Sequence, residues 1–178
     1  MTARKNPGDP NACPDATAPF NGTVQQCPFA SKKAEAIRKI KNSKFAQTEE
    51  GKKVLKKIEE LDKDGKVVMK SLGSGTRGAW SGGQIKVADA YANDPDAIAS
   101  ELVHEATHAL NEDEFPASKT KLTIDEEMRT NTDQLDFYEE QRSTGFRDPD
   151  LEDRRDDRAN GKLRDNVRGR YPGAPEHL

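Results

Sequence analysis

The stretch ELVHEATHALN at positions 101–111 constrains the fold of this 178-residue chain more than any other. It holds two of the three histidines in the sequence, His104 and His108, and Glu105 directly follows the first. Residues four apart lie one turn apart on the same face of an α-helix, so both imidazoles can point at one place. The stretch therefore favours a helix that presents two histidines and a glutamate together.

Signals in the surrounding sequence define that helix. Asp94 can accept hydrogen bonds from the first free amides, and Pro95 suits the first helical position because its missing N–H has no partner there anyway. At about 100° per residue, the apolar residues of 95–110 share an arc of about 140°, which is the face that a core would cover. The histidines lie on the adjoining arc together with Glu101 and Glu105.

Two imidazoles in this arrangement predict a zinc site, with Glu105 close enough to take a proton from a zinc-activated water. A catalytic site needs a third protein ligand. His177 is a poor candidate because it lies in a tail that we expect to be flexible, whereas Glu126 and Glu127 lie on the next predicted helix. The helical period turns Glu127 inward and Glu126 roughly opposite, so a solvated helix N-terminus is the alternative for Glu126. The expected metal ligands are two imidazoles and one carboxylate: His104, His108 and Glu127.

The remaining sequence predicts an α+β fold. Apolar residues recur at helical spacing over residues 31–40, 48–61 and 123–141. The stretch KVVMK at 66–70 has the composition of a short strand, and a glycine-rich segment leads into a second strand within QIKVADA at 84–90. We expect a small twisted sheet that packs on the histidine-bearing helix and on the helix that carries the third ligand.

Composition predicts one domain with loose ends. Only 32% of the residues are hydrophobic, 34% are charged, and the mean hydropathy is -1.00, so the core is modest. Five prolines indicate an irregular leader over 1–30, in which Cys13 and Cys27 either pair in a disulfide or remain free thiols. The expected domain spans 31–146, and 147–178 is a charged tail, flexible or helical.

Charge and hydropathy exclude several classes of protein. Residues 1–71 carry a net charge of +6 and residues 72–178 a net charge of -9, which solvated helix faces explain. The half with the histidine pair is acidic, and basic and aromatic residues do not interleave, so we expect no nucleic-acid partner. No apolar run is long enough for a signal peptide or a membrane span. We expect a soluble protein that a dedicated secretion system exports, or else a cytoplasmic one.

At His104, Glu105 and His108 the chain resembles the zincin metallopeptidases. Glu127 matches the third-ligand position of their gluzincin branch by spacing and helix face. That resemblance implies a zincin-like α+β fold, Zn²⁺, hydrolysis of peptide bonds with Glu105 as general base, and a sheet-edge strand that aligns the substrate, here 84–88.

Over about residues 40–141, the layout also resembles small metallopeptidase domains of secreted bacterial effectors and toxins. This second resemblance implies a peptide or protein substrate and an inhibitor (immunity) protein or a delivery apparatus as partners. Two alternatives remain open at this point. One is a zinc-stabilised binding module without turnover, and the other is an amidase that acts on cell-wall peptides.

Many gluzincins stabilise the substrate oxyanion with a tyrosine or a second histidine. Tyr91, between the second strand and the histidine-bearing helix, is the preferred candidate, and Arg129 is a weaker one. Tyr138 is too far along its helix from Glu127 to reach the same carbonyl. Asn131, one turn beyond Glu127, is placed to support a metal ligand from behind.

Overall fold

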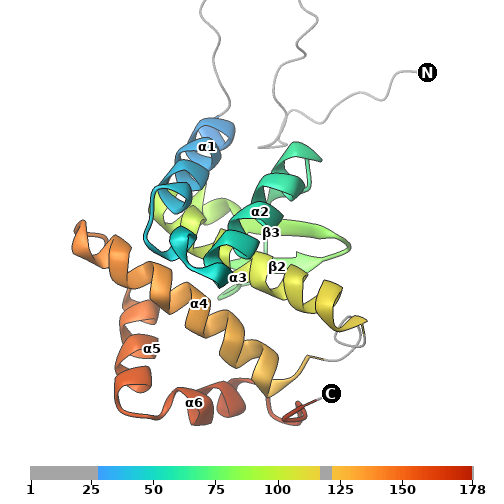
Figure 1. Cartoon of the computed structure of the whole chain (residues 1–178), viewed down its shortest axis with the longest axis vertical. Coiled ribbons are helices and arrows are strands. Elements are labelled where there is room, and N and C mark those ends of the chain that lie inside the picture. The colour runs from blue at the N-terminus through green and yellow to red at the C-terminus, as the bar shows by residue number, and fades with distance from the viewer. Residues whose placement is uncertain (1–27, 117–121, 178) are drawn as a thin grey trace, which may run out of the picture.

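The computed structural model describes residues 28–116 and 122–177 and shows an α+β fold, as expected (Figure 1). Two short 3-10 helices, Phe45–Gln47 and Asp89–Tyr91, connect longer elements. The helices are α1 (Pro28–Lys41), α2 (Glu49–Lys63), α3 (Pro95–Glu114), α4 (Ile124–Ser143), α5 (Pro149–Ala159) and α6 (Leu163–Arg170). The strands are β1 (Val67–Lys70), β2 (Gly78–Ser81) and β3 (Gln84–Ala88).

Local capping explains where several helices begin. The Thr48 side chain accepts a hydrogen bond from the amide of Gly51 at the start of α2, and Thr123 does the same for Glu126 at the start of α4. The carboxylate of Asp94 accepts hydrogen bonds from two amides at the start of α3, with proline at the first helical position. The expected beginning of α3 is therefore confirmed.

The three strands form one sheet in the order β1-β3-β2. Strand β1 pairs with β3 in parallel, with Val67 opposite Ile85, and β2 pairs with β3 antiparallel, with Gly78 opposite Val87. The expectation that 84–88 forms a sheet edge is wrong, because both sides of β3 are paired. The glycine turn after β2 folds that strand back onto β3, which leaves β2 at the edge.

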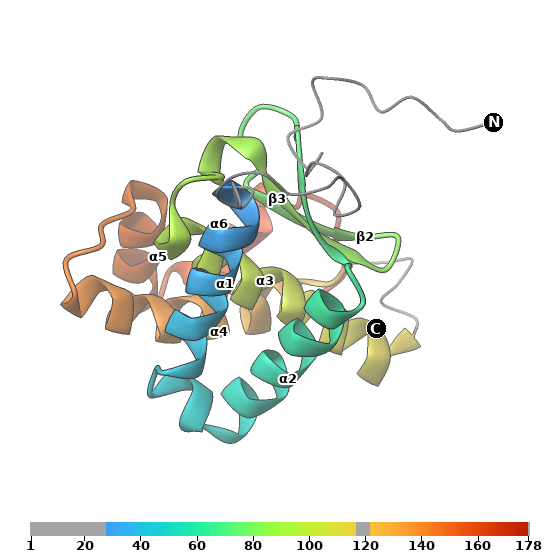
Figure 2. The same cartoon turned by 90° about the horizontal axis from the view of Figure 1, so that it is seen from above.

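Helix α3 lies at the centre of the molecule (Figures 1 and 2). It contacts α1 and α2, strands β2 and β3, and α4. Apolar residues from α1, α2, the sheet and α3 form one large buried cluster, whose fully buried members include Ile58, Ile85, Ile98 and Leu102. The core thus fixes one face of the histidine-bearing helix and leaves the other face to α4.

Helices α5 and α6 occupy the part of the chain that sequence assigned to a flexible or helical tail. Both contact α4, and Leu135, Tyr138, Leu151 and Leu163 form a second, smaller buried cluster there. At the other end, α1 already begins within the expected leader, while Cys13 and Cys27 lie outside the described residues. Over 28–116 and 122–177, no helix has both the length and the apolar character needed to cross a bilayer.

Candidate metal centre

Helix α3 carries the two histidines on the side that faces α4. His104 and His108 lie one turn apart, and their ring centroids are 5.0 Å from each other. Both side chains are half-buried, because α3 is covered by the core on its other face. The local sequence pattern therefore produces the expected pair of neighbouring imidazoles.

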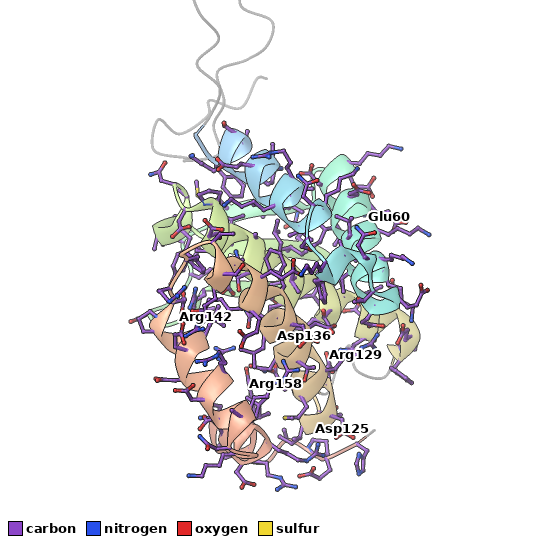
Figure 3. All side chains as sticks on the ribbon, turned by 60° about the vertical axis from the view of Figure 1, so that its left-hand side comes forward. Glu60, Asp125, Arg129, Asp136, Arg142 and Arg158 are labelled. Carbon is purple, nitrogen blue, oxygen red and sulfur yellow. The ribbon has the colours of Figure 1, made fainter. Side chains whose placement is uncertain are left out.

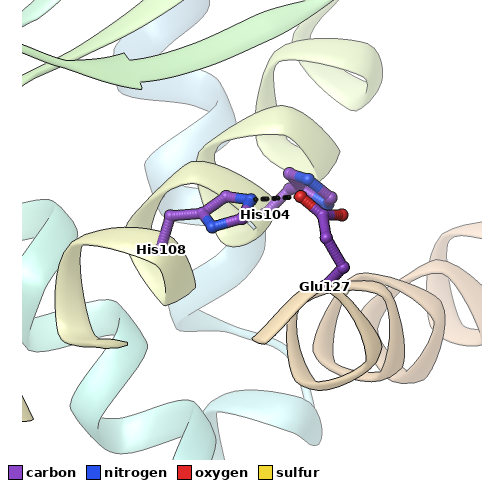
Figure 4. A group of neighbouring side chains, drawn as sticks. All are labelled: His104, His108 and Glu127. Carbon is purple, nitrogen blue, oxygen red and sulfur yellow. Dashed lines mark ion pairs between the residues drawn. The ribbon is translucent and has the colours of Figure 1, made fainter. Parts of the chain in front are cut away.

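Helix α4 brings a carboxylate to the same place. Glu127 points from the first turns of α4 at the two histidines (Figure 4). Its Oε1 lies 3.3 Å from Nε2 of His108, and one ligand atom from each of the three residues lies within 4.8 Å of the others. The structure thus brings together His104, His108 and Glu127 as a group that could hold a metal ion.

Hydrogen bonds from behind orient both imidazoles. His104 donates through Nδ1 to the Gln134 side-chain oxygen at 3.1 Å, and His108 donates through Nδ1 to Glu126 at 2.9 Å. With Nδ1 of each ring engaged, Nε2 is the nitrogen left to bind a cation. Glu126 is therefore a partner of His108 rather than a solvated helix end.

The two imidazoles differ in charge. Burial and the neighbouring His108 hold the pKa of His104 well below its usual value, so His104 is neutral and able to bind a metal. Burial also disfavours charge on His108, but its hydrogen bonds to Glu126 and Glu127 outweigh burial and raise its pKa to about 10. The carboxylates around His108 therefore favour a positive charge here, whether a proton or a metal ion supplies it.

A further layer of polar side chains supports this group. Asn131 donates a hydrogen bond to the Glu127 carboxylate at 3.3 Å, as its position on the helix predicted. Arg154 of α5 donates to the side-chain oxygens of both Asn131 and Gln134, at 2.9 and 3.2 Å. One arginine thus supports the partners of two metal-group residues, and it comes from the C-terminal segment.

Glu105 lies beside the histidines and beneath strand β2. Its carboxylate accepts a hydrogen bond from the backbone of Trp80, and burial raises its pKa to about 8. At Gly78, an added Cβ would lie 2.7 Å from a Glu105 oxygen and 3.1 Å from a Glu101 oxygen. Glycine at this point of β2 therefore allows the strand to approach the carboxylate of Glu105 closely.

The three tyrosines of the chain occupy different environments. Tyr171, which follows α6, donates a hydrogen bond from its hydroxyl to the Glu127 carboxylate. Burial together with that carboxylate raises the pKa of Tyr171 to about 12. The ring of Tyr91 instead faces the guanidinium of Arg77, 5.0 Å away. Tyr138 is fully buried and donates a hydrogen bond to Glu152. Tyr171 is thus the tyrosine that the structure brings to the metal group.

A cavity of about 630 Å³ opens onto the metal group. It is lined by β2 and the turn after it, by α3 and the start of α4, and by Tyr171. Two nitrogen ligands and one carboxylate at the wall of an open cavity leave room for a water or a substrate at a fourth position. The geometry can therefore support metal-assisted hydrolysis.

Sequence reasoning missed the roles of Glu126, Gln134, Arg154 and Tyr171. Signals for two of them are present in hindsight. Gln134 lies one turn after Asn131 on the inward face of the same helix, and Tyr171 is the single aromatic residue between positions 147 and 178. Arg154 gives no such signal, because it is one of many charges in its segment.

Comparison with protein-family models, with curated proteins and with solved structures finds no match for this chain.

Proposed function

We propose that this protein is a zinc-dependent metallopeptidase with a zincin-like active site. The observation that carries the proposal is the convergence of His104, His108 and Glu127 at the wall of a cavity, with Glu105 beside them. The two imidazoles and the carboxylate form a ligand set that zinc prefers at catalytic sites. Nε2 of His108 and Oε1 of Glu127 lie 3.3 Å apart, and the ligand atoms of all three residues are close enough to bind one metal ion.

Bound zinc would supply a Lewis acid that lowers the pKa of water and polarises a carbonyl. In this proposal Glu105 takes the proton from the attacking water and delivers it to the nitrogen of the departing amine. Burial supports that role, because a carboxyl with a pKa of about 8 holds a proton more readily than a solvated glutamate does. Gly78 and the backbone of Trp80 keep the Glu105 carboxylate in place.

Tyr171 takes the role for which sequence favoured Tyr91. Its hydroxyl reaches the Glu127 carboxylate and lines the cavity, so it is placed to donate a hydrogen bond to the oxyanion that forms during attack. Tyr91 lies against Arg77 and does not line that cavity. With zinc at saturating concentration, a Tyr171→Phe variant should therefore lose about 10²-fold in kcat, whereas Tyr91→Phe should change kcat little.

Strand β2 is the expected guide for the substrate. Residues 78–81 line the cavity, and β2 is the edge of the sheet beside the metal group. An extended peptide can add to such an edge through backbone hydrogen bonds. That mode of binding would hold the scissile bond over Glu105.

The biological setting that we propose is that of a secreted bacterial effector or toxin domain. The support is the resemblance in layout over about residues 40–141, together with the histidine motif. Such a protein would cleave a peptide or protein substrate and would meet an inhibitor protein or a delivery apparatus.

A Glu105→Gln variant tests the hydrolytic role most sharply. After both proteins are loaded with zinc, parent and variant are incubated with a peptide library, and cleavage products are followed by mass spectrometry. The variant should bind zinc as the parent does and cleave about 10²- to 10⁴-fold more slowly. Glu60→Gln, on the exposed side of α2, is the matched control and should cleave as fast as the parent.

Equal cleavage by Glu105→Gln and the parent would contradict the assigned mechanism. A parent that binds zinc but yields no product from any peptide would point instead to a binding module in which zinc only stabilises the fold.

A further inference from the structure

A second cavity, of about 410 Å³, adjoins the metal group on the side of α5 and α6. It shares four lining residues with the first cavity: Gly78, His104, Glu105 and Tyr171. Because the same side chains form the wall of both cavities, a substrate that lies over Glu105 can extend a side chain or its terminus into the second one. Its other walls carry three arginines: Arg77, Arg154 and Arg170.

The charge of Arg77 is already balanced by neighbouring carboxylates. Its two terminal nitrogens donate to both oxygens of Asp148, at 2.8 and 2.5 Å, and its Nε lies 3.1 Å from Glu101. This bidentate pair joins the start of β2 to the start of α5. Arg77 is therefore a structural group, and it is not expected to bind a ligand.

The other two arginines share one carboxylate. Arg154 pairs with Asp150 at 2.6 Å, while Arg170 approaches the same carboxylate only to 3.5 Å. The Nε of Arg154 is buried without a hydrogen-bond partner in the described part of the chain. Two guanidinium groups that line the cavity thus face one carboxylate, while Glu101, which also lines it, pairs with Arg77. Within the described residues, the guanidinium of Arg170 has no closer ion-pair partner than Asp150, so its N–H donors can bind a further acceptor.

We propose that this second cavity is a subsite for a carboxylate of the peptide substrate, bound by Arg170 and Arg154. The proposal rests on the peptidase function proposed above and adds a substrate class to it. Guanidinium groups bind carboxylates through paired hydrogen bonds. A peptide can offer that group in two ways, as an aspartate or glutamate side chain or as a free C-terminus.

Peptide binding without turnover tests the subsite and separates the two sources. Zinc-loaded Glu105→Gln protein is titrated with three short peptides of equal length. The first peptide has an internal glutamate and an amidated C-terminus. The second has glutamine in place of that glutamate and a free C-terminus. The third has the same glutamine and an amidated C-terminus. The dissociation constant of the first or the second should be about tenfold or more below that of the third, because an anionic acceptor strengthens the hydrogen bonds.

Substitution of Arg170 identifies the subsite. Its side chain is partly exposed, and among the described residues it forms an ion pair with Asp150 alone, at 3.5 Å. Arg170→Gln should therefore fold normally, which circular dichroism and thermal melting will check. In the Glu105→Gln background, this change should abolish the preference for the anionic peptide. Arg170→Glu should reverse it in favour of a peptide with lysine. Arg158→Gln, which removes an exposed arginine that pairs with Asp136, is the control and should keep the preference.

Equal affinity for all three peptides, absence of binding by any of them, or a preference that survives in Arg170→Gln would each overturn the subsite. This readout is independent of the proposed reaction. If the parent cleaves no peptide, hydrolysis fails while the carboxylate preference can still be measured. If the parent cleaves neutral and anionic peptides equally and binds them equally, the subsite alone fails.

Discussion

The two sides of the metal group are built in different ways. On the α3 side, a large apolar cluster from α1, α2, α3 and the sheet holds the two histidines in place. On the α4 side, the buried apolar cluster has four residues, and ion pairs such as Arg155–Glu139 and Arg158–Asp136 also join α5 to α4. The comparison indicates that one wall of the site is held by the large apolar core, while the other depends on the C-terminal segment.

Charged side chains cover the α4 side of the site. Figure 3 shows three of them, Asp136, Arg142 and Arg158, along α4 and α5. Arg158 pairs with Asp136 at 2.6 Å, and Arg142 pairs with Glu152 at 2.7 Å. Exposed ion pairs contribute little to stability, typically about 0 to 1 kcal/mol each. We therefore expect α5 and α6 to open more easily than the α3 core.

The largest expected effect lies in the apolar region. Ile58→Ala removes a fully buried side chain of α2 and should lower the free energy of unfolding by about 3 to 5 kcal/mol, as measured by urea denaturation. Leu55→Ala, at a half-buried position of the same helix, should lower the free energy of unfolding by clearly less. Zinc affinity of the folded protein should change little, because α2 does not carry a residue of the metal group. Equal costs at the two positions would contradict the proposed core.

A smaller loss of stability with a larger loss of zinc affinity should follow from Leu151→Ala. Leu151 is buried between α5 and α4 in the four-residue cluster. Its truncation to alanine should therefore lower the free energy of unfolding by about 2 to 3 kcal/mol. The same change should weaken zinc binding, because it loosens the helix that carries Arg154. If zinc titration gives the parent's affinity, the second wall does not depend on α5 as the comparison requires.

Arg154→Met isolates the polar contribution of that helix. Without the guanidinium, Asn131 and Gln134 lose the hydrogen bonds that hold them behind Glu127 and His104. Loss of such outer contacts commonly weakens metal binding about 10- to 100-fold. Isothermal titration with zinc will measure the change, with Arg158→Met on the same helix as the control. An unchanged affinity would mean that Arg154 does not support the metal ligands through Asn131 and Gln134.

The smallest expected effect is a pH dependence at the boundary between the regions. Asp133 of α4 accepts a hydrogen bond from Thr107 of α3, and burial raises its pKa to about 6. The folded state thus binds a proton more tightly than the unfolded state, so the free energy of unfolding should fall as the pH rises from about 4 to about 6. In the metal-free parent, this fall in the free energy of unfolding should be on the order of 1 to 2 kcal/mol over that pH range, and it should be absent from Asp133→Asn. Asp136→Asn should retain it.

Sequence predicted the elements that depend on local signals. The cap at Asp94 and the proline after it set the start of α3, and spacing of four residues placed His104 and His108 together. The helical period also placed Glu127 with the histidines, but it wrongly turned Glu126 away from them, because Glu126 accepts a hydrogen bond from His108. These features follow from geometry within a few helical turns, which the sequence pattern contains directly.

Features that depend on distant contacts were not predictable in the same way. Whether β3 is central or at an edge is decided by how β2 folds back onto it, and the alternation of Ile85 and Val87 is compatible with either position. The few apolar residues after position 147 suggested little packing, yet Leu151, Leu163 and Val167 are buried. The contact of Arg154 with the partners of the metal group depends on this packing, so no local pattern identifies it.

Zinc binding to the parent and to a His104→Ala variant tests the central claim most directly. Both proteins are stripped of metal and titrated with zinc by calorimetry, and elemental analysis then gives the zinc retained after dialysis. We predict about one zinc ion per chain for the parent and a loss of tight binding in His104→Ala, with Glu105→Gln binding as the parent does. Uptake of the same amount of zinc by His104→Ala, or none by the parent, would contradict a metal centre formed by His104, His108 and Glu127.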